Sequence, residues 1–126
     1  MRAAEIDTVV FDLDGTLVDT APDLIAALNH SLQSLGRPAV EPMLVRSLAG
    51  FGARALLDAG LTLSADAPGA LSAKAIPLFL EHYADNICTH SAPYPGLEAA
   101  LEELRVEGFK LAICTNKPEG LANRVV

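Results

Sequence analysis

Two short apolar runs, rich in β-branched residues, stand near the two ends of the chain. They are residues 6–11 (IDTVVF) and 110–115 (KLAICT), and polar residues follow each of them. Apolar runs of this length, bounded by turn residues, are typical of strands buried in a parallel sheet. We therefore expect a buried strand at each of these positions.

The sequence between the two runs has the periodicity of helices. Leucines recur on one helix face from Leu24 to Leu35, and Gly36 is placed to end that helix. Thr20 is the expected N-cap, with Asp23 three residues later as in a capping box. Further helical stretches are expected over 43–48, 53–59 (ending before Gly60), 70–86 (interrupted by Pro77), 97–108 and after 118.

The order of these elements predicts an α/β fold. A strand, a crossover helix and a second strand are typical of a parallel, Rossmann-like sheet. Two strands alone do not form a stable sheet of this kind. We therefore expect further strands from sequence beyond residue 126 or from another chain, and a tendency of the open sheet to self-associate.

Composition narrows the class of protein. The chain has 126 residues, of which 51% are hydrophobic, and a formal net charge of -7. The acidic balance argues against a partner that is nucleic acid or an anionic membrane surface. Neither a signal peptide nor a membrane span is recognisable, so a cytoplasmic location is expected. Cys88 and Cys114 lack metal-ligand spacing and are expected to be free, buried thiols.

The first strand ends in the acidic sequence Asp12-Leu13-Asp14-Gly15-Thr16. Residues at i and i+2 of a strand share one side, so Asp12 and Asp14 can converge at the carboxyl end, where open α/β sheets bind ligands. Gly15 permits a sharp turn and a close backbone approach. Because two adjacent carboxylates repel each other, a divalent cation is expected to hold them, and Mg²⁺ suits an all-oxygen site.

Plainer interpretations of this acidic sequence are an ordinary turn, a helix cap or the start of a calcium loop. The calcium interpretation fails because a loop that begins at Asp12 would need Gly at its sixth position and Glu at its twelfth. The chain has Leu17 and Asp23 there.

A second polar group follows the second strand. Thr115, Asn116 and Lys117 supply a hydroxyl, an amide and an ammonium just before a predicted helix. These groups can bind phosphate oxygens, although the same triplet could be a simple capping turn. At the strand end next to the two aspartates, it favours a phosphate site.

Together these motifs resemble the haloacid dehalogenase superfamily of phosphohydrolases. VVFDLDGT matches its first motif, LAICT its second, and the helical insert looks like the small α-helical cap of one subclass. The resemblance implies a partial parallel-sheet hydrolase core from residues 1–16 and 92–126, with an inserted all-α cap domain over 17–91. Softer matches, among them the Gly50-Phe51-Gly52-Ala53 break, are most similar to the phosphoglycolate phosphatases of that superfamily.

The resemblance also implies roles for individual residues. Asp12 would be the nucleophile that becomes an aspartyl-phosphate, and Asp14 the general acid and then the base. A carboxylate oxygen of Asp12 and the backbone carbonyl of Asp14 would bind Mg²⁺. The predicted contacts to a small phosphorylated substrate are Gly15, Thr16, Arg54, Thr115, Asn116 and Lys117.

The superfamily pattern also includes a further Lys or Arg and a downstream acid, both tens of residues after the second motif. Residues 116–126 contain neither at the required distance. A phosphatase or phosphomutase with another substrate, and a catalytically incomplete fragment, therefore remain open alternatives.

The predicted cap contributes few polar residues of note. Arg54 could bind a substrate carboxylate or could be a solvated arginine on a helix surface. The segments that flank the predicted cap, residues 16–20 and 92–95, are expected to be hinges, and Asp19 is expected to serve the hinge or the helix N-terminus. His30, His82 and His90 lack metal-ligand spacing and are expected to have no catalytic role.

Overall fold

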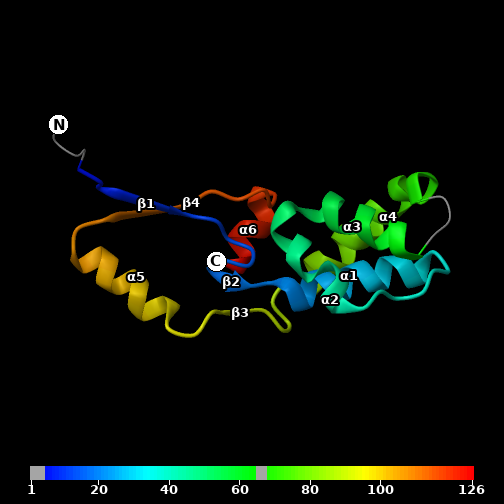
Figure 1. The fold of residues 1–126 in the computed structure, drawn as a ribbon, viewed down its shortest axis with the longest axis horizontal. Helices are drawn as coiled ribbons and strands as arrows, with labels where there is room; N and C mark the ends of the chain where they lie inside the picture. The colour runs from blue at the N-terminus through cyan, green and yellow to red at the C-terminus, as the bar shows by residue number, and fades with distance from the viewer. Residues whose placement is uncertain (1–4, 65–67) are drawn as a thin grey trace.

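The computed structural model describes residues 5–64 and 68–126, which form two regions lying end to end (Figure 1). One region holds a small parallel sheet and a helix, and the other is a layer of helices, with the last helix between them. The strands are β1 (Thr8–Phe11), β2 (Val18–Asp19), β3 (Ala92–Pro93) and β4 (Lys110–Ile113). The helices are α1 (Ala21–Ser34), α2 (Pro42–Val45), the 3₁₀ helix η1 (Arg46–Phe51), α3 (Ala53–Ser64), α4 (Pro68–Asp85), α5 (Leu97–Val106) and α6 (Glu119–Val125).

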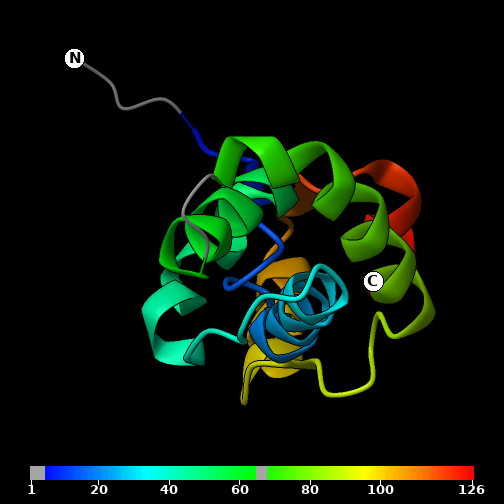
Figure 2. The same ribbon diagram turned by 90° about the vertical axis from the view of Figure 1, so that its right-hand side faces the viewer.

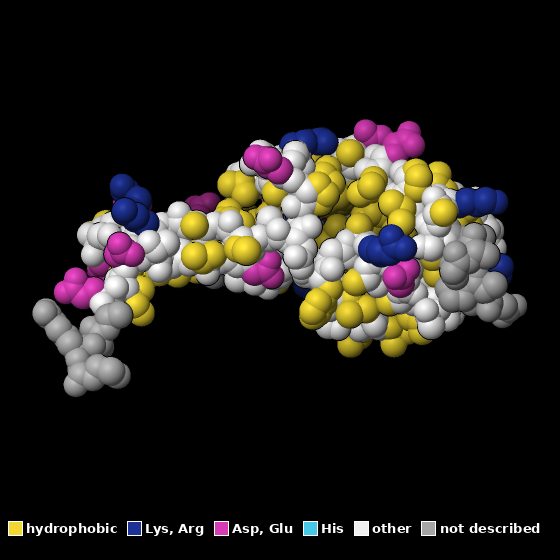
Figure 3. Space-filling view, turned by 90° about the horizontal axis from the view of Figure 1, so that it is seen from above, with side chains coloured by type: hydrophobic (Ala, Val, Ile, Leu, Met, Phe, Trp, Pro, Cys, Tyr) yellow, Lys and Arg dark blue, Asp and Glu magenta, His cyan; other side chains and the backbone are white. Residues whose placement is uncertain are grey.

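The predicted parallel sheet is confirmed, but its predicted burial is wrong. Strands β1 and β4 pair in parallel from Thr8 opposite Lys110 to Phe11 opposite Ile113. All four residues of β4 are exposed, and β1 alternates between exposed and half-buried positions. Within the described residues this sheet has no third strand, so much of its apolar surface stays open. Figure 3 shows apolar side chains along this narrow end of the molecule.

The helical layer has its own apolar core. Helices α1, α3 and α4 pack on one another, as the end-on view in Figure 2 shows. Fully buried side chains from these helices, among them Leu28, Leu56 and Phe79, form the centre of this core. Burial of these large aliphatic and aromatic side chains supplies the main driving force for folding of the helical layer.

Two helix predictions are corrected by the packing. Helix α3 does not end before Gly60 but continues through it to Ser64. A Cβ at Gly60 would lie 2.6 Å from Cδ1 of Leu28, so the glycine permits close contact between α1 and α3. Helix α4 is continuous across Pro77, which is exposed, where an interruption had been expected.

Two short segments connect the helical layer to the sheet region. Strands β2 and β3 pair antiparallel, with Val18 opposite Pro93 and Asp19 opposite Ala92. The predicted cap boundaries at residues 17 and 91 fall beside this pair.

The expected capping box at the start of α1 does not form. Thr20 is the N-cap residue, but its side chain makes no capping hydrogen bond. The buried Asp23 carboxylate instead accepts hydrogen bonds from the backbone N–H groups of His90 and Ser91 and from the Ser91 hydroxyl, at 2.6–3.0 Å. Asp23 therefore fixes the segment leading into β3 against α1.

The two cysteines are free, as expected, but both are exposed rather than buried. Cys114 follows the open strand β4, and Cys88 lies beyond the end of α4. Among the described residues, none of the helices combines the length and the apolar character needed to cross a bilayer.

Candidate active site

Asp12 lies at the point where β1 ends and a tight loop begins. Its Oδ1 accepts a hydrogen bond from the backbone N–H of Leu13 at 2.9 Å. Gly15 adopts a φ of 78°, which favours glycine, and its N–H donates to the carbonyl of Val18 at 2.9 Å. The loop therefore returns the chain to β2 within a few residues and leaves the Asp12 side chain exposed.

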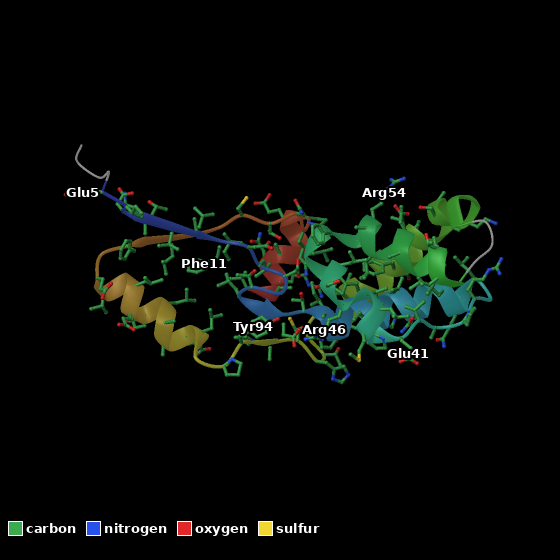
Figure 4. The ribbon with its side chains drawn as sticks, in the orientation of Figure 1. Glu5, Phe11, Glu41, Arg46, Arg54 and Tyr94 are labelled. Carbon is green, nitrogen blue, oxygen red and sulfur yellow. The ribbon has the colours of Figure 1, made fainter. Side chains whose placement is uncertain are left out.

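An open pocket of about 710 Å³ lies between this loop and the helical layer. Asp12, Asp14, Gly15 and Asn116 line it from the sheet region, and Arg46 and Tyr94, both labelled in Figure 4, also line it. The rest of its lining is Asp19, Ala21, Met43, Ser47, Ala49, Gly50 and Phe51. The structure thus brings the predicted nucleophile, the predicted acid and part of the second motif to one cavity.

Asp14 is held differently from Asp12. Its carboxylate is buried, and its Oδ1 accepts a hydrogen bond from the Thr20 hydroxyl at 2.6 Å. The same oxygen lies 2.7 Å from the Lys117 ammonium. Within the described part of the chain, Oδ2 accepts no hydrogen bond. One oxygen of Asp14 is therefore anchored, whereas the other has no hydrogen-bond donor among the described residues.

The oxygens that could hold a cation come from Asp12 and Asp14. A Cβ built on Gly50 would lie 3.2 Å from the Asp14 carbonyl oxygen and 3.7 Å from Asp12 Oδ2. These two oxygens thus face the same space, which the missing side chain of Gly50 keeps open. Mg²⁺ often takes one or two protein carboxylates and completes its shell with water and phosphate.

The charges around the pocket also favour a bound cation. Among the described residues that line the pocket, three carry carboxylates and one, Arg46, carries a guanidinium. An anionic substrate therefore needs added positive charge to enter. Among residues 5–64 and 68–126, no three His, Cys, Asp or Glu side chains gather into a metal site. The oxygens present fit Mg²⁺ as a partial ligand set.

The second motif divides between two environments. Thr115 follows Cys114 in the loop after β4, and its hydroxyl accepts a hydrogen bond from the Lys117 N–H at 3.1 Å. Asn116 lines the large pocket, whereas Thr115 and Lys117 do not. The ammonium of Lys117 contacts Asp14 and the hydroxyl of Tyr83, where the sequence predicted a phosphate contact. Thr16 is exposed and likewise lies outside the pocket lining.

The basic residue that lines the pocket is Arg46 rather than Arg54. Arg54 is exposed near the start of α3, outside the pocket lining, and its side chain points away from the pocket in Figure 4. Arg46 makes two hydrogen bonds to Asp19, each of 2.8 Å, which joins η1 to β2. Asp19 thus pairs across the hinge segment, and its expected role at the helix N-terminus is not what its contacts indicate.

Sequence reasoning missed Arg46, Tyr83 and Tyr94 as site residues. Arg46 and its partner Asp19 are 27 residues apart, and Tyr83 and Lys117 are 34 apart. No motif marks any of these pairs. Tyr94 lies in the loop sequence SAPYP (residues 91–95) before α5, and its place in this loop was the one sequence feature that could have marked it.

A carboxylate at a strand end, a second anchored carboxylate and an oxygen pair that fits Mg²⁺ are the groups that the sequence predicted for a phosphohydrolase site. A family model for haloacid dehalogenase-like hydrolases matches residues 9–126, and the chain belongs to that family. This confirms the resemblance inferred from the two motifs.

The chain is similar to several phosphoglycolate phosphatases. It is 46% identical over 114 residues to that of Mesorhizobium japonicum, covering 88% of this chain and 49% of that protein. It is 43% identical over 123 residues to that of Caulobacter vibrioides, covering 94% and 51%. A crystal structure described as a predicted phosphoglycolate phosphatase from Haemophilus somnus is 31% identical, with a TM-score of 0.80, covering 91% and 53%. The chain spans about half the length of the curated relatives it matches.

Proposed function

We propose that this chain carries the catalytic aspartates and cap of a Mg²⁺-dependent phosphomonoester hydrolase, with 2-phosphoglycolate as its substrate. The observation that carries the proposal is the convergence of Asp12 Oδ2 and the Asp14 carbonyl oxygen on the space beside Gly50. Both lie at the carboxyl end of a parallel strand, where α/β folds bind ligands. The names of the similar proteins support the choice of substrate.

In the first step, Asp12 attacks the phosphorus atom of the substrate through a carboxylate oxygen. The bond between phosphorus and the glycolate oxygen breaks, and an aspartyl-phosphate forms on Asp12. Asp14 in its protonated form delivers a proton through its free oxygen to the departing alkoxide, which leaves as glycolate. Its other oxygen stays on Thr20 and Lys117 during this transfer.

In the second step, water attacks the phosphorus atom of the aspartyl-phosphate. Asp14, now a carboxylate, accepts the proton of that water, the acyl-phosphate bond breaks, and Asp12 is regenerated with release of inorganic phosphate. Mg²⁺, held by Asp12 and the Asp14 carbonyl, would compensate the negative charge of the phosphoryl group. Asn116 lines the same pocket and would contact the phosphoryl oxygens.

The predicted cap, residues 17–91, would recognise the leaving group. Arg46 projects from this region to the pocket, and its Nη2 donates to both carboxylate oxygens of Asp19, which leaves Nη1 and Nε without a bond to Asp19. A guanidinium matches the geometry of a carboxylate. We propose that Arg46 binds the carboxylate of 2-phosphoglycolate, the group that distinguishes this substrate from simple alkyl phosphates.

The test is Mg²⁺-dependent release of phosphate from 2-phosphoglycolate by the purified chain, compared with Asp12→Asn. Activity that is lost in the variant supports the aspartyl-phosphate mechanism. Equal activity in both proteins would refute it. Absence of activity in both would refute the proposed function for this chain and would favour a catalytically incomplete unit. Faster turnover of a phosphate ester without a carboxylate would refute the proposed substrate.

A further inference from the structure

Lys117 is a buried lysine: its ammonium does not line the large pocket and is largely shielded from solvent. Its side chain is 4% exposed, and the side chain of its partner Asp14 is 7% exposed. Burying an ammonium is costly unless the group is paired and hydrogen-bonded. Lys117 meets this condition through Asp14 Oδ1 at 2.7 Å and the hydroxyl of Tyr83.

Tyr83 belongs to helix α4 and is 1% exposed. The Lys117 ammonium donates to its hydroxyl oxygen and lies 4.6 Å from the centre of its ring. Burial, together with the nearby Asp14 carboxylate, holds the pKa of the Tyr83 phenol above its usual range. The phenol therefore stays neutral, and its oxygen is available to accept from the ammonium.

These contacts join three parts of the chain around the Asp14 carboxylate and its partner Lys117. Thr20 begins α1, Tyr83 lies in α4, and Lys117 follows β4 on the sheet side. Thr20 and Lys117 both bind Oδ1 of Asp14, so the carboxylate cannot rotate without losing both partners. Its Oδ2 is the oxygen left for proton transfer.

We propose that Lys117 is a positioning residue for Asp14, and that Tyr83 of the helical layer holds the Lys117 ammonium in place. This inference rests on the proposed function, because it assigns Asp14 the proton transfers. A proton donor that is displaced by about 1 Å loses much of its effect. Loss of Lys117 would therefore slow the step that needs a proton and leave phosphate binding largely intact.

The geometry is tested first, without reference to activity. The chain contains three lysines, of which Lys74 and Lys110 are exposed. NMR of the ammonium groups is expected to reveal one signal protected from exchange with water, which Lys117→Met abolishes. Asp14→Asn and Tyr83→Phe are each expected to speed its exchange by about tenfold or more, since the first removes the paired negative charge and the second removes the phenol acceptor. Absence of any protected ammonium would overturn the proposal.

The positioning role is tested by comparing two substrates. The alkoxide of 2-phosphoglycolate needs a proton to leave, whereas the leaving group of p-nitrophenyl phosphate does not. We expect Lys117→Met to lower kcat for 2-phosphoglycolate by about 30-fold, within the range of general acid catalysis, with KM changed less than about threefold. The loss of kcat with p-nitrophenyl phosphate is expected to be under about threefold. Tyr83→Phe should lower kcat for 2-phosphoglycolate in the same selective way by about fivefold.

The outcomes separate this inference from the proposed function. Lys110→Met, a matched change at an exposed site on β4, is expected to leave both activities unchanged. Equal losses on both substrates, or a rise in KM alone, would overturn the positioning role and favour direct phosphate binding by Lys117. If the unaltered chain hydrolyses neither substrate, the proposed function fails, and the ammonium signal alone decides whether Lys117 is fixed on Asp14.

Discussion

The buried carboxylate of Asp23 is expected to be a main determinant of stability at the joint between the two regions. Asp23 is 2% exposed and receives hydrogen bonds from three donors: the backbone N–H groups of His90 and Ser91 and the hydroxyl of Ser91. These donors belong to the segment just before β3. The perturbation of interest is Asp23→Asn, which keeps the size of the side chain but removes its charge and one acceptor oxygen.

The expected loss follows from the number and type of these hydrogen bonds. A hydrogen bond to a charged group contributes roughly 1.5–3 kcal/mol, and a buried donor left without a partner costs about 1–3 kcal/mol. In Asp23→Asn one oxygen still accepts, while the new amide N–H turns toward groups that are themselves donors. We therefore expect the free energy of unfolding to fall by about 3 kcal/mol, and Tm by roughly 10 °C.

Urea and thermal unfolding, followed by circular dichroism, would measure this change. Asp58→Asn is a matched control, because Asp58 is exposed on α3 and its carboxylate makes no hydrogen bond or ion pair with the described residues. The control is expected to stay within about 0.5 kcal/mol of the unaltered chain. A loss below about 1 kcal/mol in Asp23→Asn would refute the reasoning, since it would mean that these hydrogen bonds exchange for water at little cost.

Three further predictions concern the pocket, the buried phenol and the open sheet. Arg46→Met is expected to raise KM for 2-phosphoglycolate about tenfold and to leave KM for p-nitrophenyl phosphate unchanged, because the latter has no carboxylate; a larger effect of Arg54→Met would favour the residue chosen from sequence alone. Burial raises the pKa of the Tyr83 phenol, so the stability that its neutral form contributes is complete below the ordinary tyrosine pKa and is lost as pH rises through the higher folded value. Tyrosinate absorbance should therefore report ionisation of Tyr83 together with alkaline unfolding, and ionisation in the still-folded chain would contradict this. Leu111 and Ile113 are 37% and 42% exposed on β4, so the pair of changes Leu111→Lys and Ile113→Lys is expected to shift size-exclusion profiles from self-associated species toward monomer; a monomeric unaltered chain would exclude this self-association.

Much of the fold followed from local sequence because its signals are local. Parallel pairing of the two apolar runs was predictable from the helical connection between them, and the structure has it with Phe11 opposite Ile113. The end of α1 before Gly36 was predictable because glycine readily adopts the positive φ that ends a helix, and the structure gives Gly36 a φ of 74°. The passage of α3 through Gly60 was not, since it depends on the contact with Leu28 in another helix.

The sequence by itself determined which chemical groups lie at the candidate site and at which edge of the sheet they lie. Asp12 and Asp14 stand two residues apart after an apolar strand, and strand geometry alone carries them to the carboxyl edge of the sheet. Which distant residues contact one another depended on the tertiary structure alone. In it, Arg46 pairs with Asp19, and Lys117 contacts Asp14 and Tyr83. The physical reason is that a long basic side chain can reach any carboxylate within its length, and only the packing of the helices on the sheet decides which one is there.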